Sequence, residues 1–269
     1  MKIIIDKSYR YEKFHWQIKN LKYITISQDD ETFIPKEYVF IVNSSPKLLT
    51  FKITEFTDKL KELIRDKSEL DERIYEKNQD FNYKEYVIEF FALNIHLFKP
   101  LIYKSKSKLN FIRINPENLV KSERDFIILL EEFLENNNPD FEYEEIYLLR
   151  NPSRKGIGFF ETKGFYPDFI LWIIKKDQQI IDFIDPKGLV FIDKNDEKLR
   201  LYEDIKTIES DLNQSTGLNV KLNSFILSIT EFNQLFKKWG VPKEELELQN
   251  ILFLEDGIDC IKQLFVKSV

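Results

Sequence analysis

Two hydrophobic runs separated by a short polar break constrain the fold of this chain more than any other feature. The runs span 167–174 and 179–186, and the break between them contains KKDQ. Short runs rich in isoleucine and phenylalanine predict two buried strands joined by a tight turn. The first run carries Asp168 near its start, and the second carries Asp185 near its end, where a buried strand would ordinarily have apolar residues.

A hairpin that turns at Lys176 and Asp177 would bring these two aspartates opposite each other. Directly opposed residues of an antiparallel pair have Cβ atoms about 5 Å apart. Two like charges at that separation destabilise each other, and unpaired buried carboxylates cost several kcal/mol more. A divalent cation removes both costs, and Mg²⁺ prefers one or two carboxylates together with water and substrate phosphate. We therefore predict a Mg²⁺ site at Asp168 and Asp185, with Mn²⁺ as the expected substitute.

Lys187 adds a third chemical group to this pattern. The strand period of two puts Lys187 on the same face as Asp185. A lysine there can hold an attacking water or offset charge that develops on a phosphate. Each motif also has a structural interpretation, because Pro-Asp is a common turn dipeptide and Asp-Pro-Lys-Gly is a common loop exit. The register across the hairpin favours the functional interpretation.

The segments around the hairpin alternate between helical and strand patterns, which predicts an α/β protein. From residue 122 to 230 the predicted order is α-β-β-β-α-β, and this order implies a mixed sheet flanked by helices. Ser122 is the predicted N-cap of the first helix, with Asp125 completing a capping box. After residue 230, a helix, a strand and a final helix are predicted. The predicted core elements are a helix at 122–136, strands at 145–151, 167–174, 179–186 and 221–230, and a helix at 196–212.

The first part of the chain, residues 1–115, is predicted to be an α+β recognition or docking region. Short strands are expected there, including one at 38–43, together with helices at 57–76 and 83–98. No catalytic pattern occurs in this region. The second part, residues 116–269, contains the hairpin and is predicted to form the domain that carries the chemistry.

Several other charged residues are candidates for the same site. Glu123 shares the inward-facing side of the first core helix, although an acid in a first helical turn is also favoured by the helix dipole alone. Glu161 is the competing third acid. Four basic residues near the acids could bind phosphates, or could be solvated surface charges. These four are Arg154, Lys155, Lys163 and Lys198.

Composition excludes several other kinds of site. The chain has one cysteine, so it has no internal disulfide and no cysteine-based zinc site, and this usage suits a reducing cytoplasm. Only two histidines are present, which leaves carboxylates and lysines to carry any chemistry. The net charge of −6 disfavours non-specific coating of nucleic acid but permits a local basic groove. No secretory signal and no run of membrane-spanning length is evident, so a cytoplasmic protein is expected.

At these residues the chain resembles the PD-(D/E)XK nuclease superfamily. Pro167-Asp168 resembles the PD element, and Asp185-Pro186-Lys187 resembles the (D/E)XK element. Glu123 matches the acid that many members carry on the first core helix. The string YLLRNPSRKGIGFFETKGFYPDFILWI, followed by IDFIDPKGL, is similar to the C-terminal nuclease region of DEAD/DEAH-box helicases of type III restriction-like and phage-defence systems. The resemblance covers about 120–269.

This resemblance implies a restriction-endonuclease-like αβββαβ core and a Mg²⁺-dependent endonuclease that hydrolyses DNA in a bacterial restriction or anti-phage defence system. Asp168 and Asp185 would be metal ligands, the Pro186 carbonyl and Glu123 further ligands, and Lys187 the catalytic lysine. No Walker A pattern occurs in the chain, so a helicase or ATPase subunit would be a separate candidate partner.

Two alternatives come from other classes of function. The first is a catalytically silent nuclease fold that docks DNA or a partner. The Asp-Asp-Lys set speaks against it, because an opposed pair of acids is costly without a metal. The second is an RNA-directed nuclease, which the sequence does not separate from a DNA-directed one.

Overall fold

The computed structural model describes most of the second half of the chain and short parts of the first half. Contacts between Cα atoms divide the described residues into two compact units, one within Pro35–Arg124 and the other within Asp125–Val269. The predicted functional division between residues 115 and 116 stays a prediction. The described ranges are 39–42, 79–83, 86–97, 101–105, 112–115, 117–136, 143–152, 156–158 and 166–269.

The first unit consists mainly of antiparallel strands in its described parts. Strand β1 pairs with β5, and β2, β3 and β4 form a separate three-stranded sheet in that order. The strand predicted at 38–43 is confirmed by β1. The strands are β1 Val39–Val42, β2 Gln79–Tyr83, β3 Tyr86–Phe91, β4 Leu101–Lys104 and β5 Ile112–Asn115.

The helix predicted at 83–98 is wrong, because this segment contains β3. Its sequence YVIEFF is dominated by β-branched and aromatic residues, which favour a pleated surface. Ile88 and Phe90 are buried, whereas Val87 and Glu89 are only half-buried, as a strand period of two requires. The predicted helix at 57–76 lies outside the described residues.

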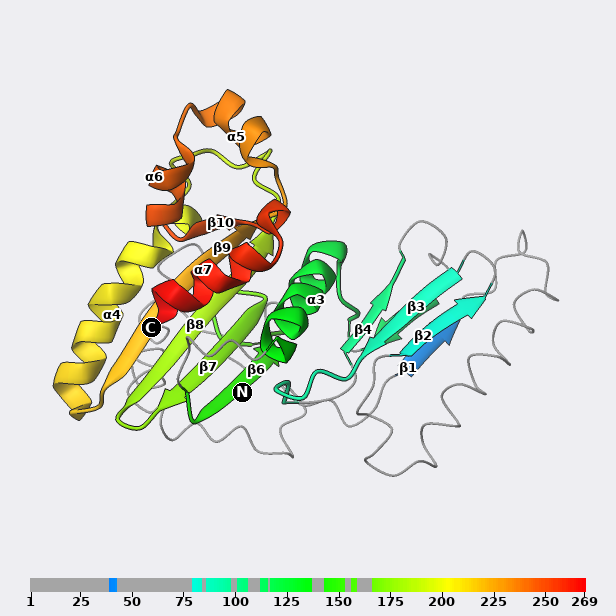
Figure 1. Cartoon of the computed structure of the whole chain (residues 1–269), viewed down its shortest axis with the longest axis horizontal. Helices are drawn as coiled ribbons and strands as arrows, with labels where there is room; N and C mark the ends of the chain where they lie inside the picture. Colours follow the sequence, from blue (N-terminus) through cyan, green and yellow to red (C-terminus); the bar gives the residue numbers. More distant parts are fainter. Residues whose placement is uncertain are drawn as a thin grey trace, which may run out of the picture. The chain divides into compact units, whose positions relative to one another are not determined.

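The second unit is built on a five-stranded mixed sheet of order β10-β9-β8-β7-β6 (Figure 1). Strands β6, β7 and β8 are antiparallel neighbours, and β8, β9 and β10 are parallel neighbours. Helices flank this sheet, so the predicted mixed α/β class is confirmed. The strands are β6 Glu145–Arg150, β7 Phe169–Lys175, β8 Gln178–Lys187, β9 Val220–Ser228 and β10 Ile251–Phe253.

The order of elements from residue 121 to 228 is α3-β6-β7-β8-α4-β9, as predicted. A one-turn 3₁₀ helix, η3, precedes α4, and a second, η4, precedes the last helix. The helices are α3 Lys121–Glu135, η3 Glu197–Arg200, α4 Leu201–Thr216, α5 Phe232–Trp239, α6 Lys243–Leu248, η4 Leu254–Asp256 and α7 Ile258–Ser268.

The two faces of this sheet are covered by different helices. On one face, Ile181 and Phe183 of β8 belong to the same buried cluster as residues of α4. On the other face, the Phe126 ring of α3 lies 5.0 Å from the Phe169 ring of β7. Helix α7 crosses the same face near β8 and β9 (Figure 1). Because side chains alternate along a strand, Asp185 lies on the face covered by α4.

Helix α4 also occupies the edge of the sheet. Strand β10 pairs with the last part of β9, from Ile226 onward, and no other described strand pairs with the first part of β9 on that side. The Asn213 side chain donates to Val220 O at 2.7 Å and accepts from Val220 N at 2.9 Å. The Glu209 carboxylate accepts from Leu222 N at 2.6 Å. Side chains of α4 therefore replace a neighbouring strand along this part of β9.

Candidate functional site

The register of the β7–β8 hairpin is the one predicted from the sequence. The pairs run from Phe169 with Ile184 to Lys175 with Gln178, and the turn between the strands is formed by residues 176–177. Asp168 directly precedes Phe169, and Asp185 directly follows Ile184, which are the two partners of the pair farthest from the turn. If the same register continues for one more position, Asp168 lies opposite Asp185, as predicted.

Asp185 is almost fully buried, at 4% exposed, and its charge is met by Lys187. The Lys187 ammonium donates to Asp185 Oδ2 and forms an ion pair with it. This contact confirms that both side chains lie on the same face of β8. A half-buried cation beside a buried carboxylate provides the partner that a buried charge requires.

Pro186 occupies a strand position where the missing N–H costs nothing. Lys187 O accepts from Ile229 N at 3.1 Å, so the backbone groups of Lys187 are directed toward β9. Alternation then directs the backbone of Pro186 toward the β7 side, past the last pair of the β7–β8 ladder. Its carbonyl therefore points to the side on which Asp168 lies, as a ligand to a shared cation would.

Asp168 lies just before β7, and Asn151 holds the backbone of this segment. Asn151 N donates to Asp168 O at 2.8 Å, and its side-chain amide donates to Pro167 O at 2.8 Å. The sequence interpretation missed Asn151. The signal that could have identified it is its place directly after a strand and shortly before Gly156 and Gly158, where the backbone approaches something closely.

Glu123 lies at the start of α3 and is 5% exposed. Its Oε2 accepts from Val120 N at 2.7 Å, which satisfies the backbone of the residue before the helix. Ser122 is therefore not the N-cap that was predicted, because the helix begins at Lys121 and Ser122 lies inside it. The structural role of Glu123 is observed, and its role as a metal ligand stays a prediction.

The predicted phosphate-binding residues are mostly beyond what the structure describes. Arg154, Lys155 and Lys163 lie outside the described residues, and so does Glu161. Lys198 is half-buried in η3, where its backbone N donates to the Asp196 side chain at 3.0 Å. The contact of Lys198 with phosphate stays a prediction.

The turn that follows Lys187 exposes an aromatic ring. Phe191 is 97% exposed, yet the backbone on both sides of it is fixed. The Lys238 ammonium of α5 donates to Val190 O and to Ile192 O, and the Trp239 indole donates to Ile192 O at 3.3 Å. An exposed ring on a fixed turn offers a surface on which a nucleobase can stack.

Asp182 is a third acid in the hairpin, and the sequence interpretation passed over it. It is fully buried, and it accepts from Asn223 Nδ2 at 2.7 Å and from Ser268 Oγ at 2.6 Å. Burial raises the pKa of this carboxyl to about 6. Because Asp182 and Asp185 are three residues apart on one strand, they face opposite sides of the sheet. Asp182 therefore does not belong to the candidate site.

The donor atoms at the candidate site suit a hard cation. Asp168 and Asp185 carry carboxylate oxygens, and the Pro186 carbonyl is directed toward β7, the strand that Asp168 precedes. Mg²⁺ typically binds through one or two carboxylates and completes its shell with water and substrate phosphate. Within the described ranges, no three histidine, cysteine or acidic side chains form a group able to hold a metal ion. The oxygen donors of Asp168, Asp185 and Pro186 are of the kind that Mg²⁺ takes.

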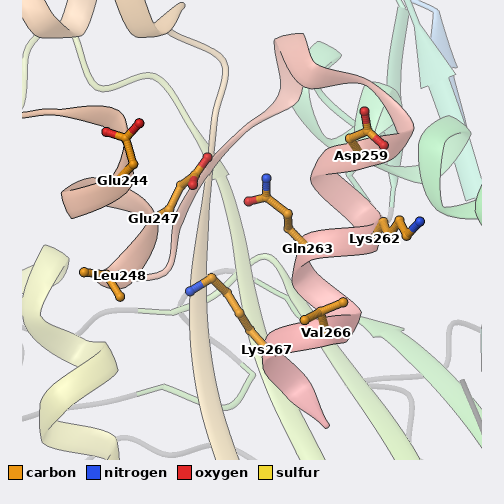
Figure 2. Close-up of a pocket in the computed structure, with 8 residues that line it drawn as sticks. All are labelled: Glu244, Glu247, Leu248, Asp259, Lys262, Gln263, Val266 and Lys267. Carbon is orange, nitrogen blue, oxygen red and sulfur yellow. The ribbon is translucent and has the colours of Figure 1, made fainter. Parts of the chain in front are cut away.

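A separate cleft of about 630 Å³ lies between α6 and α7 (Figure 2). Its α6 wall carries two glutamates, and its α7 wall carries two lysines and an aspartate. None of the predicted site residues lines it, so it is distinct from the candidate site. The lining residues are Glu244, Glu247, Leu248, Asp259, Lys262, Gln263, Val266 and Lys267.

Comparison of the chain with family models, with curated proteins and with solved structures found no match. The resemblance to PD-(D/E)XK nucleases therefore stays a prediction that rests on the motif residues. In the part of the chain that the structure describes, none of the helices combines the length and apolar character needed to span a membrane.

Proposed function

We propose that this chain is a Mg²⁺-dependent endonuclease with a restriction-endonuclease-like core that hydrolyses DNA phosphodiester bonds. The observation that carries the proposal is the register of the β7–β8 hairpin. Continued one step past the Phe169–Ile184 pair, this register sets Asp168 opposite Asp185, and Lys187 contacts Asp185. A bacterial restriction or anti-phage defence system, in the cytoplasm and with a separate helicase or ATPase subunit, is the setting that the motif resemblance supports.

Two further features support the proposal. The element order α3-β6-β7-β8-α4-β9 is the αβββαβ order expected of such a core. The exposed Phe191 ring, four residues after Lys187, gives a nucleobase a place to stack on the turn that follows β8.

The chemistry assigned to the residues follows from their charges. When bound, Mg²⁺ would activate water and stabilise the leaving oxygen of the phosphodiester. Asp168 and Asp185 would hold the cation, and the Pro186 carbonyl would add a neutral ligand. The Lys187 ammonium would orient the attacking water and offset negative charge that develops on the phosphate.

A catalytically silent module for docking DNA or a partner is the second candidate, and one observation favours it. Lys187 already neutralises the buried Asp185 carboxylate, so this acid has a charged partner without any metal. The two candidates differ in whether the Lys187 ammonium is a structural partner of Asp185 or a participant in hydrolysis.

Cleavage assays with a matched pair of variants test the proposal. The purified chain is incubated with plasmid DNA, single-stranded DNA and RNA, with Mg²⁺, with Mn²⁺ or with EDTA. Asp185→Asn keeps the size of the side chain and removes its charge, and it should lower metal-dependent cleavage about 100-fold or more. Asp177→Asn makes the same change at the exposed turn of the same hairpin, about 25 Å away along β8, and should cleave like wild type.

Each outcome of this assay selects one function. Metal-dependent cleavage of DNA that Asp185→Asn abolishes supports the endonuclease. Cleavage of RNA alone supports the RNA-directed nuclease. Absence of cleavage under every metal condition, also after addition of a candidate motor subunit, leaves the docking module. Equal cleavage by both variants would overturn the assignment of nuclease activity to this site.

A further inference from the structure

Asn151 is buried, and both the nitrogen and the oxygen of its side-chain amide form hydrogen bonds. It directly follows β6 and is 5% exposed. Its Nδ2 donates to Ile157 O at 2.7 Å and to Pro167 O at 2.8 Å, and its Oδ1 accepts from Ile157 N at 2.8 Å. One side chain thus joins three segments of the chain: the end of β6, the segment at Ile157 and the segment before β7.

The backbone of Asn151 extends the same connection to Asp168. Asn151 N donates to Asp168 O at 2.8 Å. Asp168 precedes the first residue of β7, so pairing with β8 does not fix it. Two hydrogen bonds from Asn151 hold the Pro167–Asp168 backbone, one from its side chain and one from its main chain.

The surrounding backbone is shaped to admit the Asn151 amide. A Cβ atom added to Gly156 would lie 1.9 Å from Asn151 Oδ1, which is far inside van der Waals contact. An alanine at position 156 would therefore have to displace the amide and break its hydrogen bonds. Buried polar groups that lose their partners cost about 1–3 kcal/mol each, so the amide and Gly156 depend on each other.

We propose that Asn151 is a positioning residue that sets the Asp168 carboxylate for metal binding. The inference rests on the proposed function, because it assigns Asn151 to the metal site at Asp168 and Asp185. Residues that orient a metal ligand without touching the metal typically change metal affinity by about 10–100-fold when they are replaced. Both hydrogen bonds from Asn151 go to backbone carbonyl oxygens, so Asn151 does not itself occupy the Asp168 carboxylate.

The chain offers a control with the same chemistry at a distant place. Asn213 also holds a backbone segment through both ends of its amide, donating to Val220 O and accepting from Val220 N. Val220 pairs with Gln179, which lies six residues before Asp185 on β8 and so about 20 Å away from it. Asn→Asp at either position removes the amide donor and places a carboxylate against backbone carbonyl oxygens.

Isothermal titration with Mn²⁺, on the full chain and without substrate, compares Asn151→Asp with Asn213→Asp. Both variants should lower the thermal unfolding midpoint, because both lose buried hydrogen bonds. Only Asn151→Asp should weaken Mn²⁺ binding, by about 10–100-fold. Gly156→Ala, which displaces the same amide without changing it, should weaken binding in the same direction and replaces Asn151→Asp if that variant does not fold.

The outcomes separate this inference from the proposed function. Wild-type affinity in Asn151→Asp or in Gly156→Ala overturns the positioning role and leaves the metal site intact. Equal weakening by Asn213→Asp also overturns it, because the effect then follows from lost stability. A wild-type chain that binds no Mn²⁺ overturns the metal site itself, and the positioning role with it.

Discussion

Asp182 and Asp185 have the same side chain on the same strand and nevertheless have different partners. Asp185 is joined by the Lys187 ammonium, whereas Asp182 is held by the neutral donors of Asn223 and Ser268. Burial raises the pKa of Asp182 to about 6, and the hydrogen bonds and the nearby charges of two lysines only partly oppose this. The face of the sheet on which each aspartate lies therefore decides whether its carboxylate has a charged or a neutral partner.

The buried Asp182 should make stability depend on pH in a defined direction. Its pKa is about 6 in the folded state and near 3.8 ordinarily, so between these values the folded state holds a proton that the unfolded chain has released. Stability from this group is complete below pH 4 and falls as pH rises to about 6, by on the order of 3 kcal/mol. Asp182→Asn should remove that slope, because an amide does not titrate in this range. The hydrogen bonds can be kept, since the new amide can donate to Ser268 Oγ while Ser268 donates to Leu264 O.

Denaturant unfolding at a series of pH values between 4 and 7 measures this difference. The unfolding free energy of wild type should fall relative to that of Asp182→Asn as the pH rises. Asp177→Asn, which removes an exposed acid from the turn, serves as the control for the change in net charge. Parallel pH profiles for wild type and Asp182→Asn would contradict the assignment.

Among the elements, α4 performs two tasks at once. Its apolar side packs Leu201, Ile205 and Leu212 onto the sheet, and its polar side chains cap the edge of β9. Lys206 Nζ donates to Leu222 O at 2.7 Å, while Glu209 accepts from Leu222 N. A strand edge whose backbone groups already have partners does not offer them to another strand.

Removal of one of these caps should be measurable as a loss of stability. Glu209→Ala leaves Leu222 N without its acceptor and should destabilise the fold by about 1–3 kcal/mol. Glu203→Ala, on the same helix, removes an exposed ion pair with Arg200 and should change stability by less than about 1 kcal/mol. Urea unfolding measures the unfolding free energy of both variants. Equal losses would show that the Glu209 hydrogen bond to Leu222 N stabilises the fold no more than an exposed ion pair does.

The sequence predicted these elements where local pattern and packing agree. The hairpin register followed from the turn residues and from the alternation on both strands, and it held over every pair of the β7–β8 ladder. The segment 83–98 failed because its short apolar run suits a helix or a strand, and pairing of β3 with β2 and β4 decided for the strand.

The candidate site was predictable only in part, for a physical reason. Asp168, Asp185 and Lys187 lie on one hairpin, so their relation follows from strand geometry alone. The Asn151 amide contacts Pro167, sixteen positions later in the sequence, and no local pattern encodes such a contact. Asp182 could have been recognised as an acid in a buried run, but its partners come from β9 and from α7, which are distant in sequence.

For the whole molecule, metal binding and stability should be linked. A ligand that binds only the folded state stabilises it by RT ln(1 + [L]/Kd), which is about 1.4 kcal/mol at ten times Kd. Mg²⁺ should therefore raise the thermal unfolding midpoint of wild type but not of Asp185→Asn. KCl at equal ionic strength is the control, because a chain of net charge −6 is also stabilised by screening. Equal shifts with KCl and with Mg²⁺ would argue against a specific site.

Ser268 joins the last turn of α7 to the interior of the sheet. Its hydroxyl contacts Asp182, and both side chains are fully buried. Loss of this hydroxyl would leave a buried carboxylate with one donor fewer. A substitution in the last turn of this helix would therefore have the consequences of a mutation in the core of the sheet.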